Sequence, residues 1–224
     1  LWNTYGFFVT YANIDKWDSS KMEKNFKPQH KLDQWILSEL NQLIATVTES
    51  MEDYNLMKAT RPMFDFVDGL SNWYVRRSRR RFWKSESDMD KMQAYQTLYT
   101  VLVEFSKLLA PFMPYVADEV FINLTGKESV HLEDWPVVNK DLINEAINTE
   151  NRVVRSIVAL GHAVRDKANI KVRQPLSLVQ VALPHSIDES VVNLQKSVIC
   201  EELNVKDLVL LKDASDFIKT VVTP

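Results

Sequence analysis

The chain has 224 residues, of which 46% are hydrophobic and 25% are charged, and its formal net charge is -3. This composition is typical of a globular protein with one large or two modest domains. A single cysteine excludes an internal disulfide, and four scattered histidines exclude a zinc cluster of familiar spacing. Glycine occurs only four times and forms no phosphate-binding loop, so the sequence predicts no catalysis by this chain alone.

No apolar run approaches the roughly 18 residues that are needed to cross a bilayer. The first ten residues, LWNTYGFFVT, lack the basic region of a signal peptide. The sequence therefore predicts a cytoplasmic protein without a membrane partner. The chain begins and ends abruptly in apolar sequence, which indicates a piece of a longer protein.

Apolar residues at helical spacing predict a first helix over 31–53. Its stripe consists of Leu32, Ile36, Leu40, Leu43, Val47, Met51 and Tyr54. A second helix is predicted over about 57–84, with Pro62 in its first turn or at a kink. The stripe of this helix consists of Thr60, Met63, Phe64, Val67, Leu70, Tyr74 and Ser78.

A third helical stretch is predicted over 92–120, bent where Pro111 and Pro114 fall and closed at Gly126. A fourth follows over 143–168. From about residue 170 the pattern changes, because QPLSLVQVAL and NVKDLVLLK alternate as strands do, and SIDESVVNLQKSVICEEL between them has helical spacing. The predicted fold is therefore mainly α: a bundle of long antiparallel helices followed by a small α+β unit.

The segment SNWYVRRSRRRFWK, residues 71–84, has six cations and four aromatics and no acid. A helical wheel places one group of these residues opposite the core side: Trp73, Arg76, Arg80 and Trp83. Arginine clamps phosphate oxygens bidentately, and both arginine and tryptophan stack on bases. Such a face can equally be solvated or paired with carboxylates, so the pattern alone leaves nucleic-acid binding and a structural role open.

The same segment, preceded by FDFVDGL, resembles the signature of the helical domain that follows the catalytic core in isoleucyl-tRNA synthetases. Four other segments are similar to this family: LWNTYGFFVTYANID, KLDQWILSELN, LLAPFMPYVADEVF and IKVRQPLSLV. The resemblance thus covers essentially the whole chain. LLAPFMPYVADE is shared in looser form by valyl and leucyl relatives, so the equivalent domain of one of those enzymes is an alternative.

The resemblance implies an anticodon-binding region cut from a class I synthetase. Residues 1–30 would be a junction from the catalytic core, 31–169 the α-helical anticodon-binding domain, and 170–224 the start of a small C-terminal junction domain. The family uses ATP, with Mg²⁺, to attach isoleucine to tRNA(Ile). Because this chain has no HIGH motif, we expect it to be inactive alone and to need no cofactor or metal. Its implied partners are tRNA(Ile) and the catalytic core of the same polypeptide, in a monomer.

Helix geometry separates two groups of candidate contacts. At 1.5 Å per residue the first helix carries the chain about 33 Å away, and the second brings it back toward the junction. We therefore expect the basic segment to hold tRNA backbone or the domain junction, through Trp73, Arg76, Arg77, Arg79, Arg80, Arg81, Trp83 and Lys84. Candidate anticodon contacts at the opposite end are Lys58, Arg61, Lys127, His131 and Trp135.

Two further cations, Lys171 and Arg173, are candidate phosphate contacts or members of an ion pair where the strands begin. The competing hypothesis for the whole chain is a helical scaffold or interdomain module whose arginines form ion pairs and make no direct tRNA contact.

Overall fold

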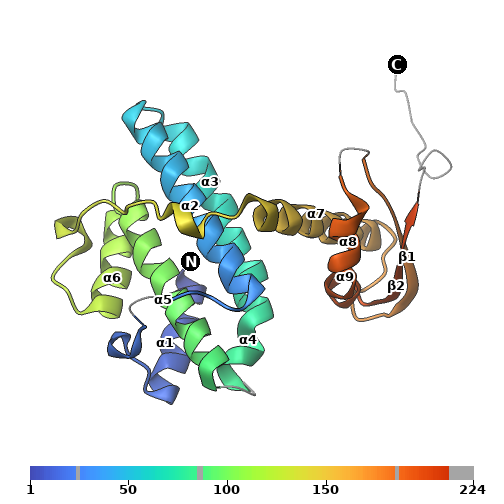
Figure 1. Cartoon of the computed structure of the whole chain (residues 1–224), viewed down its shortest axis with the longest axis horizontal. Helices are drawn as coiled ribbons and strands as arrows, with labels where there is room; N and C mark the ends of the chain where they lie inside the picture. Colours follow the sequence, from blue (N-terminus) through green and yellow to red (C-terminus); the bar gives the residue numbers. More distant parts are fainter. Residues whose placement is uncertain (24–25, 85–87, 185–186, 212–224) are drawn as a thin grey trace. The chain divides into compact units, whose positions relative to one another are not determined.

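The computed structural model describes residues 1–23, 26–84, 88–184 and 187–211 (Figure 1). The chain divides into two compact units, Leu1–Glu145 and Ala146–Pro224. The described part of the first unit is helical, and that of the second combines helices with a two-stranded sheet, so the predicted fold class is confirmed. The tail of the predicted C-terminal unit, 212–224, lies outside the described residues.

The first unit contains long helices joined by short connections. Its helices are α1 (Trp2–Asp15), α2 (Lys31–Glu52), α3 (Leu56–Asp68), α4 (Arg76–Trp83), α5 (Asp88–Leu109) and α6 (Pro114–Thr125). Short 3₁₀ turns accompany them in the described residues: η1 (Ser19–Lys21), η3 (Val130–Leu132) and η4 (Lys140–Leu142). Helices α2 and α3 form a hairpin, and α5 packs on α2 to complete the core (Figure 1).

The first 30 residues, predicted to be a junction, contain a folded helix. Helix α1 buries Phe8 and Ala12 and ends at Lys16, whose φ of 50° is left-handed. The turn brings Trp17 against Tyr95 of α5, where the two rings stack with centroids 5.6 Å apart. The junction role stays a prediction, but the segment is an integral part of the first unit.

The helix predicted over 92–120 is wrong in one respect, because it is two helices and not one bent helix. Proline lacks the N–H that an internal helical position requires, and its ring clashes with the preceding turn. Two prolines within four residues therefore end α5 at Leu109, and Pro114 becomes the first residue of α6. Helix α6 packs against α5.

The helix predicted over 57–84 runs continuously, but its middle is a π-helix, η2 (Gly69–Val75). Its i→i+5 winding takes about one residue more per turn than an α-helix. An α-helical wheel drawn through it therefore misplaces side chains. Trp73, predicted on the exposed face, is only 5% exposed, and its neighbours Tyr74 and Val75 are buried as well.

The second unit starts with α7 (Glu145–Lys167). Glu145, the first residue of this helix, is the last residue of the first unit. Strands β1 (Leu176–Ala182) and β2 (Val205–Leu211) pair in parallel, with Val179 opposite Leu208. The helix predicted between them is two, α8 (Glu189–Leu194) and α9 (Lys196–Leu203), separated at Gln195, whose side chain donates to Glu150 of α7. In the described part of the chain no helix is long and apolar enough to span a membrane.

Two contacts join α7 to α9 and to the loop before β1 within the second unit. The buried Arg165 guanidinium donates to the carbonyls of Lys171 (3.2 Å), Gln174 (3.0 Å), Leu203 (2.7 Å) and Asn204 (3.1 Å). The last two carbonyls lie at the C-terminal end of α9, where the helix dipole favours a cation.

The second contact is a close approach of α7 to α9. A Cβ at Gly161 would lie 2.5 Å from Cδ2 and 3.1 Å from Cγ of Leu203, which is buried. We therefore predict that Gly161→Ala destabilises the second unit by about 1–2 kcal/mol, since overpacking exceeds the helix-propensity gain of alanine. Amide hydrogen exchange of β1 and β2 measures the effect.

All six tryptophans lie in residues 1–145, so tryptophan fluorescence reports unfolding of the first unit and should not change. The matched control is Gly6→Ala, where a Cβ meets no atom within 4 Å, and this variant should not slow or accelerate exchange in β1. Unchanged exchange in Gly161→Ala would mean that Leu203 adapts without cost.

Candidate nucleic-acid interface

Helix α4 presents a cationic face. Four of its basic residues, counted with the C-capping position, are exposed: Arg76, Arg79, Arg80 and Lys84. Trp83, on the same side, is 60% exposed. Side chains three, four and seven residues apart share one side of a helix, so these groups form a continuous surface. We call Arg76, Arg79, Arg80, Trp83 and Lys84 the α4 face.

The other two arginines of the segment have structural positions. Arg77 is half-buried, and its guanidinium carbon lies 5.3 Å from the centroid of the Trp73 ring. This is a cation–π contact, which holds both side chains against the helix. The prediction that Trp73 lies on the exposed face is wrong, because the π-helical turn directs its indole into the core.

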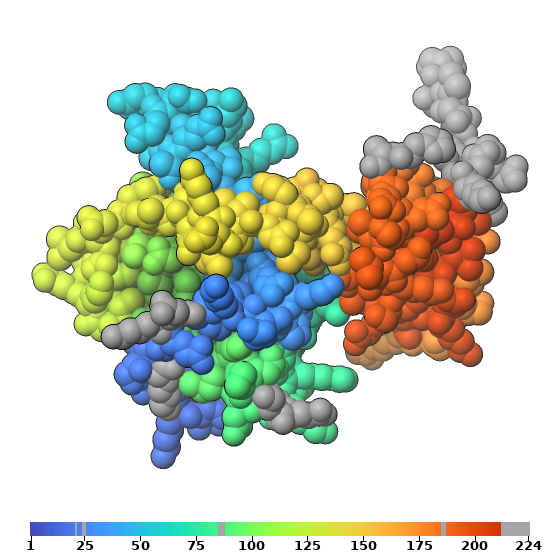
Figure 2. Space-filling model, in the orientation of Figure 1, coloured from blue at the N-terminus to red at the C-terminus, as the bar shows by residue number. Residues whose placement is uncertain are grey.

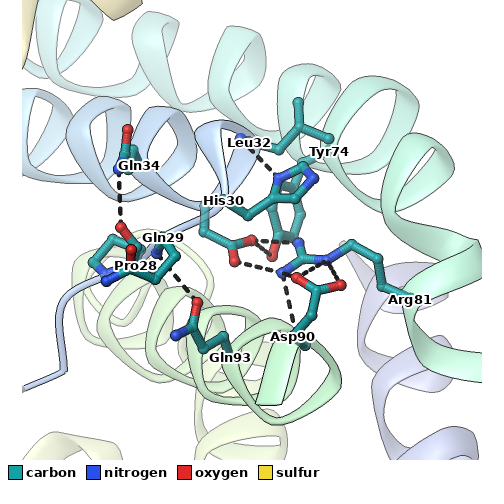
Figure 3. Close-up of polar contacts among 10 residues, drawn as sticks. Pro28, Gln29, His30, Leu32, Gln34, Tyr74, Arg81, Asp90 and Gln93 are labelled. Atoms are coloured by element: carbon teal, nitrogen blue, oxygen red, sulfur yellow. Dashed lines mark hydrogen bonds and ion pairs between the residues drawn. The ribbon is translucent and has the colours of Figure 1, made fainter. Parts of the chain in front are cut away.

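Arg81 is the second correction, because it is 8% exposed and lies between two acids (Figure 3). Its two terminal nitrogens donate to the two carboxylate oxygens of Asp33, each at 2.7 Å. Its Nε donates to Asp90 at 2.9 and 3.0 Å. The Tyr74 hydroxyl donates to Asp33 at 2.7 Å. A fully engaged guanidinium has nothing left to offer a phosphate.

The charges of this cluster match the helices that carry them. Arg81 is in the last turn of α4, Asp33 in the first turn of α2 and Asp90 in the first turn of α5. A cation is favoured at a helix C-terminus and an anion at an N-terminus. Burial opposes the charged form of Arg81, but its hydrogen bonds to both acids more than compensate and raise its pKa. Burial and the nearby Asp33 likewise raise the pKa of Tyr74.

Anchoring Arg81 inward determines which residues of α4 face outward. Phe82, next in sequence, is buried with ring centroids 5.1 Å from Phe7 and 4.9 Å from Tyr95. With both of these side chains in the core, Arg79 and Arg80 are left on the solvent side of the same turns. The core contacts therefore orient the α4 face.

The three residues before α2, Pro28 to His30, lie beside this cluster (Figure 3). The backbone N–H of Gln29 donates to Gln93 Oε1 of α5 at 3.1 Å. His30 is the N-cap of α2, and its Nδ1 accepts from the Leu32 N–H at 3.1 Å. Burial, and then the positive charge of Arg81, lower the pKa of His30, which keeps Nδ1 unprotonated and able to accept.

The distal candidates divide into exposed and engaged residues. Lys58 and Arg61 are exposed on α3, as expected, and His131 is exposed on η3. Lys127 forms an ion pair with Glu133 at 2.6 Å. Trp135 is half-buried, and its Nε1 donates to Thr48 of α2 at 2.8 Å. Trp135 is thus a tether between the loop and α2, a role the sequence pattern did not predict.

The remaining predicted cations, Lys171 and Arg173, are exposed in the loop before β1. Lys171 contacts Arg165 through its backbone carbonyl and not through its side chain, so its ammonium group stays a candidate phosphate contact. Within the described ranges, no three His, Cys, Asp or Glu residues are grouped so as to hold a metal ion.

An apolar surface that the sequence pattern did not predict lies at the tip of the α2–α3 hairpin. Tyr54 and Phe64, both assigned to core stripes, are 92% and 76% exposed, and Met57 is exposed as well. The sequence pattern did not separate Phe64 from the buried Met63, because an apolar helical stripe can contain two adjacent residues.

Comparison with known proteins places the chain among tRNA ligases. The sequence profile described as "Anticodon-binding domain of tRNA ligase" matches residues 33–181. The chain is 50% identical over 223 residues to an isoleucine–tRNA ligase of Dehalococcoides mccartyi, which covers 93% of the chain. It is 41% identical over 230 residues to the isoleucine–tRNA ligase of Protochlamydia amoebophila, and this match covers 100% of the chain. It is 38% identical over 233 residues to that of Treponema denticola, and this match covers 98% of the chain. The chain spans about a fifth of these relatives, 21% or 22% of their length.

The buried ion pair yields a prediction on stability. Arg81→Ala should lower the free energy of unfolding of the first unit by about 3–5 kcal/mol, because it leaves Asp33 buried without its cation. Urea denaturation followed by tryptophan fluorescence measures this. Arg80→Ala, one residue earlier and exposed, is the matched control and should change stability by less than about 0.5 kcal/mol. Equal effects of the two substitutions would contradict the structural assignment of Arg81.

The His30 cap yields a prediction on pH dependence. Because its pKa is lowered from 6.5 on folding, the unfolded chain binds the proton more readily. The stability that the neutral cap contributes is therefore present above pH 6.5 and is lost as pH falls through the folded pKa. We expect His30→Asn, a cap that does not titrate, to lose less stability than the wild type between about pH 7.5 and about pH 5.5.

Urea denaturation at the two pH values measures the difference. His131→Asn, at an exposed position, is the matched control and should keep the wild-type pH dependence. If His30→Asn also kept it, the cap would not be the titrating element.

Proposed function

Since the chain belongs to the family of anticodon-binding domains of tRNA ligases, we propose that it is the tRNA-binding region of an isoleucine–tRNA ligase. In this role it holds tRNA(Ile) while a catalytic portion elsewhere in the same polypeptide attaches isoleucine. ATP and Mg²⁺ are required by that portion and not by this chain. The protein acts as a monomer in the cytoplasm, where tRNA is charged for translation.

One observation carries the proposal beyond similarity: the α4 face gathers exposed cations on a helix that the core holds rigidly. Nucleic-acid affinity depends mainly on cations that neutralise backbone phosphates, whatever the net charge of the protein. Arginine serves this purpose well, because its planar fork matches two phosphate oxygens. The exposed Trp83 adds a flat apolar surface beside these cations.

The α4 face is assigned to the tRNA backbone and not to the anticodon. Phosphate contacts fix the position of an RNA but carry no base information. The α4 face runs along α4, whose C-terminal end is joined through Arg81 to the N-terminal ends of α2 and α5. The hairpin tip lies at the C-terminal end of α2 and the start of α3. Base recognition therefore belongs to other residues of the domain.

We predict that Arg79→Ala combined with Arg80→Ala in the full-length ligase weakens tRNA(Ile) binding and flattens its salt dependence. Each lost phosphate contact should reduce the slope of log K against log salt by about 0.7–0.9, so the double variant loses about 1.5–2. Binding titrations at several salt concentrations measure the slope.

The matched control is Arg79→Lys with Arg80→Lys, which retains both charges and should keep the slope while losing bidentate geometry. If the alanine variant kept the wild-type slope and instead lost stability, the α4 face would be structural. The chain would then act as a helical scaffold without direct tRNA contact.

A further inference from the structure

The tip of the α2–α3 hairpin projects beyond the other helices of the first unit (Figures 1 and 2). Four large apolar side chains are exposed there, although the rest of the hairpin buries its apolar residues well. They are Tyr54 (92% exposed), Leu56, Met57 and Phe64 (76% exposed). A cluster of exposed apolar groups at one place indicates a surface for binding.

Tyr54 is held there by backbone geometry that tyrosine does not favour. Its φ is 54°, in the left-handed region that usually takes glycine at a helix end. The backbone N–H of Tyr54 donates to the carbonyl of Met51 at 3.0 Å, and the N–H of Asn55 donates to the carbonyl of Ser50 at 2.8 Å. These two hydrogen bonds close the C-terminal end of α2. A bulky residue at this φ costs folding energy and, being almost fully exposed, gains no packing in return.

The exposed side of α3 continues this surface. Met57, Arg61 and Phe64 are spaced i, i+4 and i+7 and therefore lie in one row along the helix. Arg61 thus stands between Met57 and Phe64 in the row. Planar cations and aromatic rings both stack on nucleobases, and such stacking does not depend on base identity.

Charge determines the orientation of an RNA on the tip. Exposed acids, Glu52 and Asp53, lie at the end of α2, and a further exposed acid, Asp65, lies later on α3. The exposed cations Lys58 and Arg61 lie in the first two turns of α3, so phosphates would be attracted there and repelled from the end of α2. Bases directed at Tyr54 and Phe64 must be unpaired, because paired bases in an A-form helix do not expose their faces.

From this arrangement we propose that the hairpin tip, defined as Tyr54, Met57, Arg61 and Phe64, is a stacking surface for unpaired bases of the tRNA anticodon loop, with the loop phosphates beside Lys58 and Arg61. The inference rests on the proposed function. It assigns to the tip the base contacts that the α4 face does not make, and it makes apolar stacking the main interaction there.

The test compares two RNAs. Affinity of the full-length ligase is measured for a tRNA(Ile) transcript and for the same tRNA with abasic residues in the anticodon. Phe64→Ala should weaken binding of the intact tRNA by about 5- to 150-fold, the loss of one stacked base. It should leave the affinity for the abasic tRNA and the salt slope unchanged, because it removes no phosphate contact. Phe64→Trp should retain the wild-type affinity.

A second variant separates function from stability. Tyr54→Asn keeps a residue that tolerates the left-handed conformation but removes the ring. We expect its melting temperature to be no lower than that of the wild type, while its affinity for intact tRNA falls. A residue with a purely structural role would show a loss of stability instead.

Tyr115→Ala is the matched control, since Tyr115 is 90% exposed but lies on α6, outside the tip. It should bind both RNAs as the wild type does. The inference is overturned if Phe64→Ala binds both RNAs normally, which would leave the tip to a protein partner, or if both affinities fall equally, which would indicate a backbone contact. Failure of the wild type to bind any tRNA would instead overturn the proposed function itself.

Discussion

The ion pairs of Arg81 with Asp33 and Asp90 are the constraint on which the first unit depends. They join the C-terminal end of α4 to the N-terminal ends of α2 and α5 at one buried point. Each charge also complements the dipole of its own helix, which offsets part of the cost of burial. Because Arg81 and Phe82 point inward, Arg80 on the preceding position points outward, so the cluster that stabilises the core also orients the α4 face.

The π-helix η2 is the second determinant of this face. By adding about one residue per turn between α3 and α4, it changes the phase of the helix. The stripe that α3 buries, through Ala59, Met63 and Phe66, is thereby connected to a different phase in α4, where Ser78 and Arg81 are buried. Because of this change of phase, α3 and α4 expose different faces although they belong to one continuous helix.

The two candidate RNA surfaces differ in chemistry in the way that their roles require. The α4 face consists of cations with one indole and suits the uniform charge of a phosphate backbone. The hairpin tip combines two aromatic rings and a thioether with one cation, Arg61, and Lys58 lies beside it. Backbone affinity and base contact would therefore be separable by mutation, because they depend on residues at opposite ends of α3–α4.

The sequence by itself determined the fold class and the bounds of its most regular elements: periodicity placed α2 within one residue and β1 within two, because side-chain patterning is a local property. It also revealed the family, through segments spread over the chain. Only the tertiary structure decided which of two chemically similar neighbouring side chains has a buried partner. The helical wheel placed Arg80 on the exposed face, but it could not identify the partner of Arg81: Asp33, 48 residues away in the sequence, binds its guanidinium in the core. Likewise Tyr54 fits a core stripe, but the turn that ends α2 leaves it nothing to pack against. Burial depends on which distant groups the fold brings together, and local patterns do not encode that.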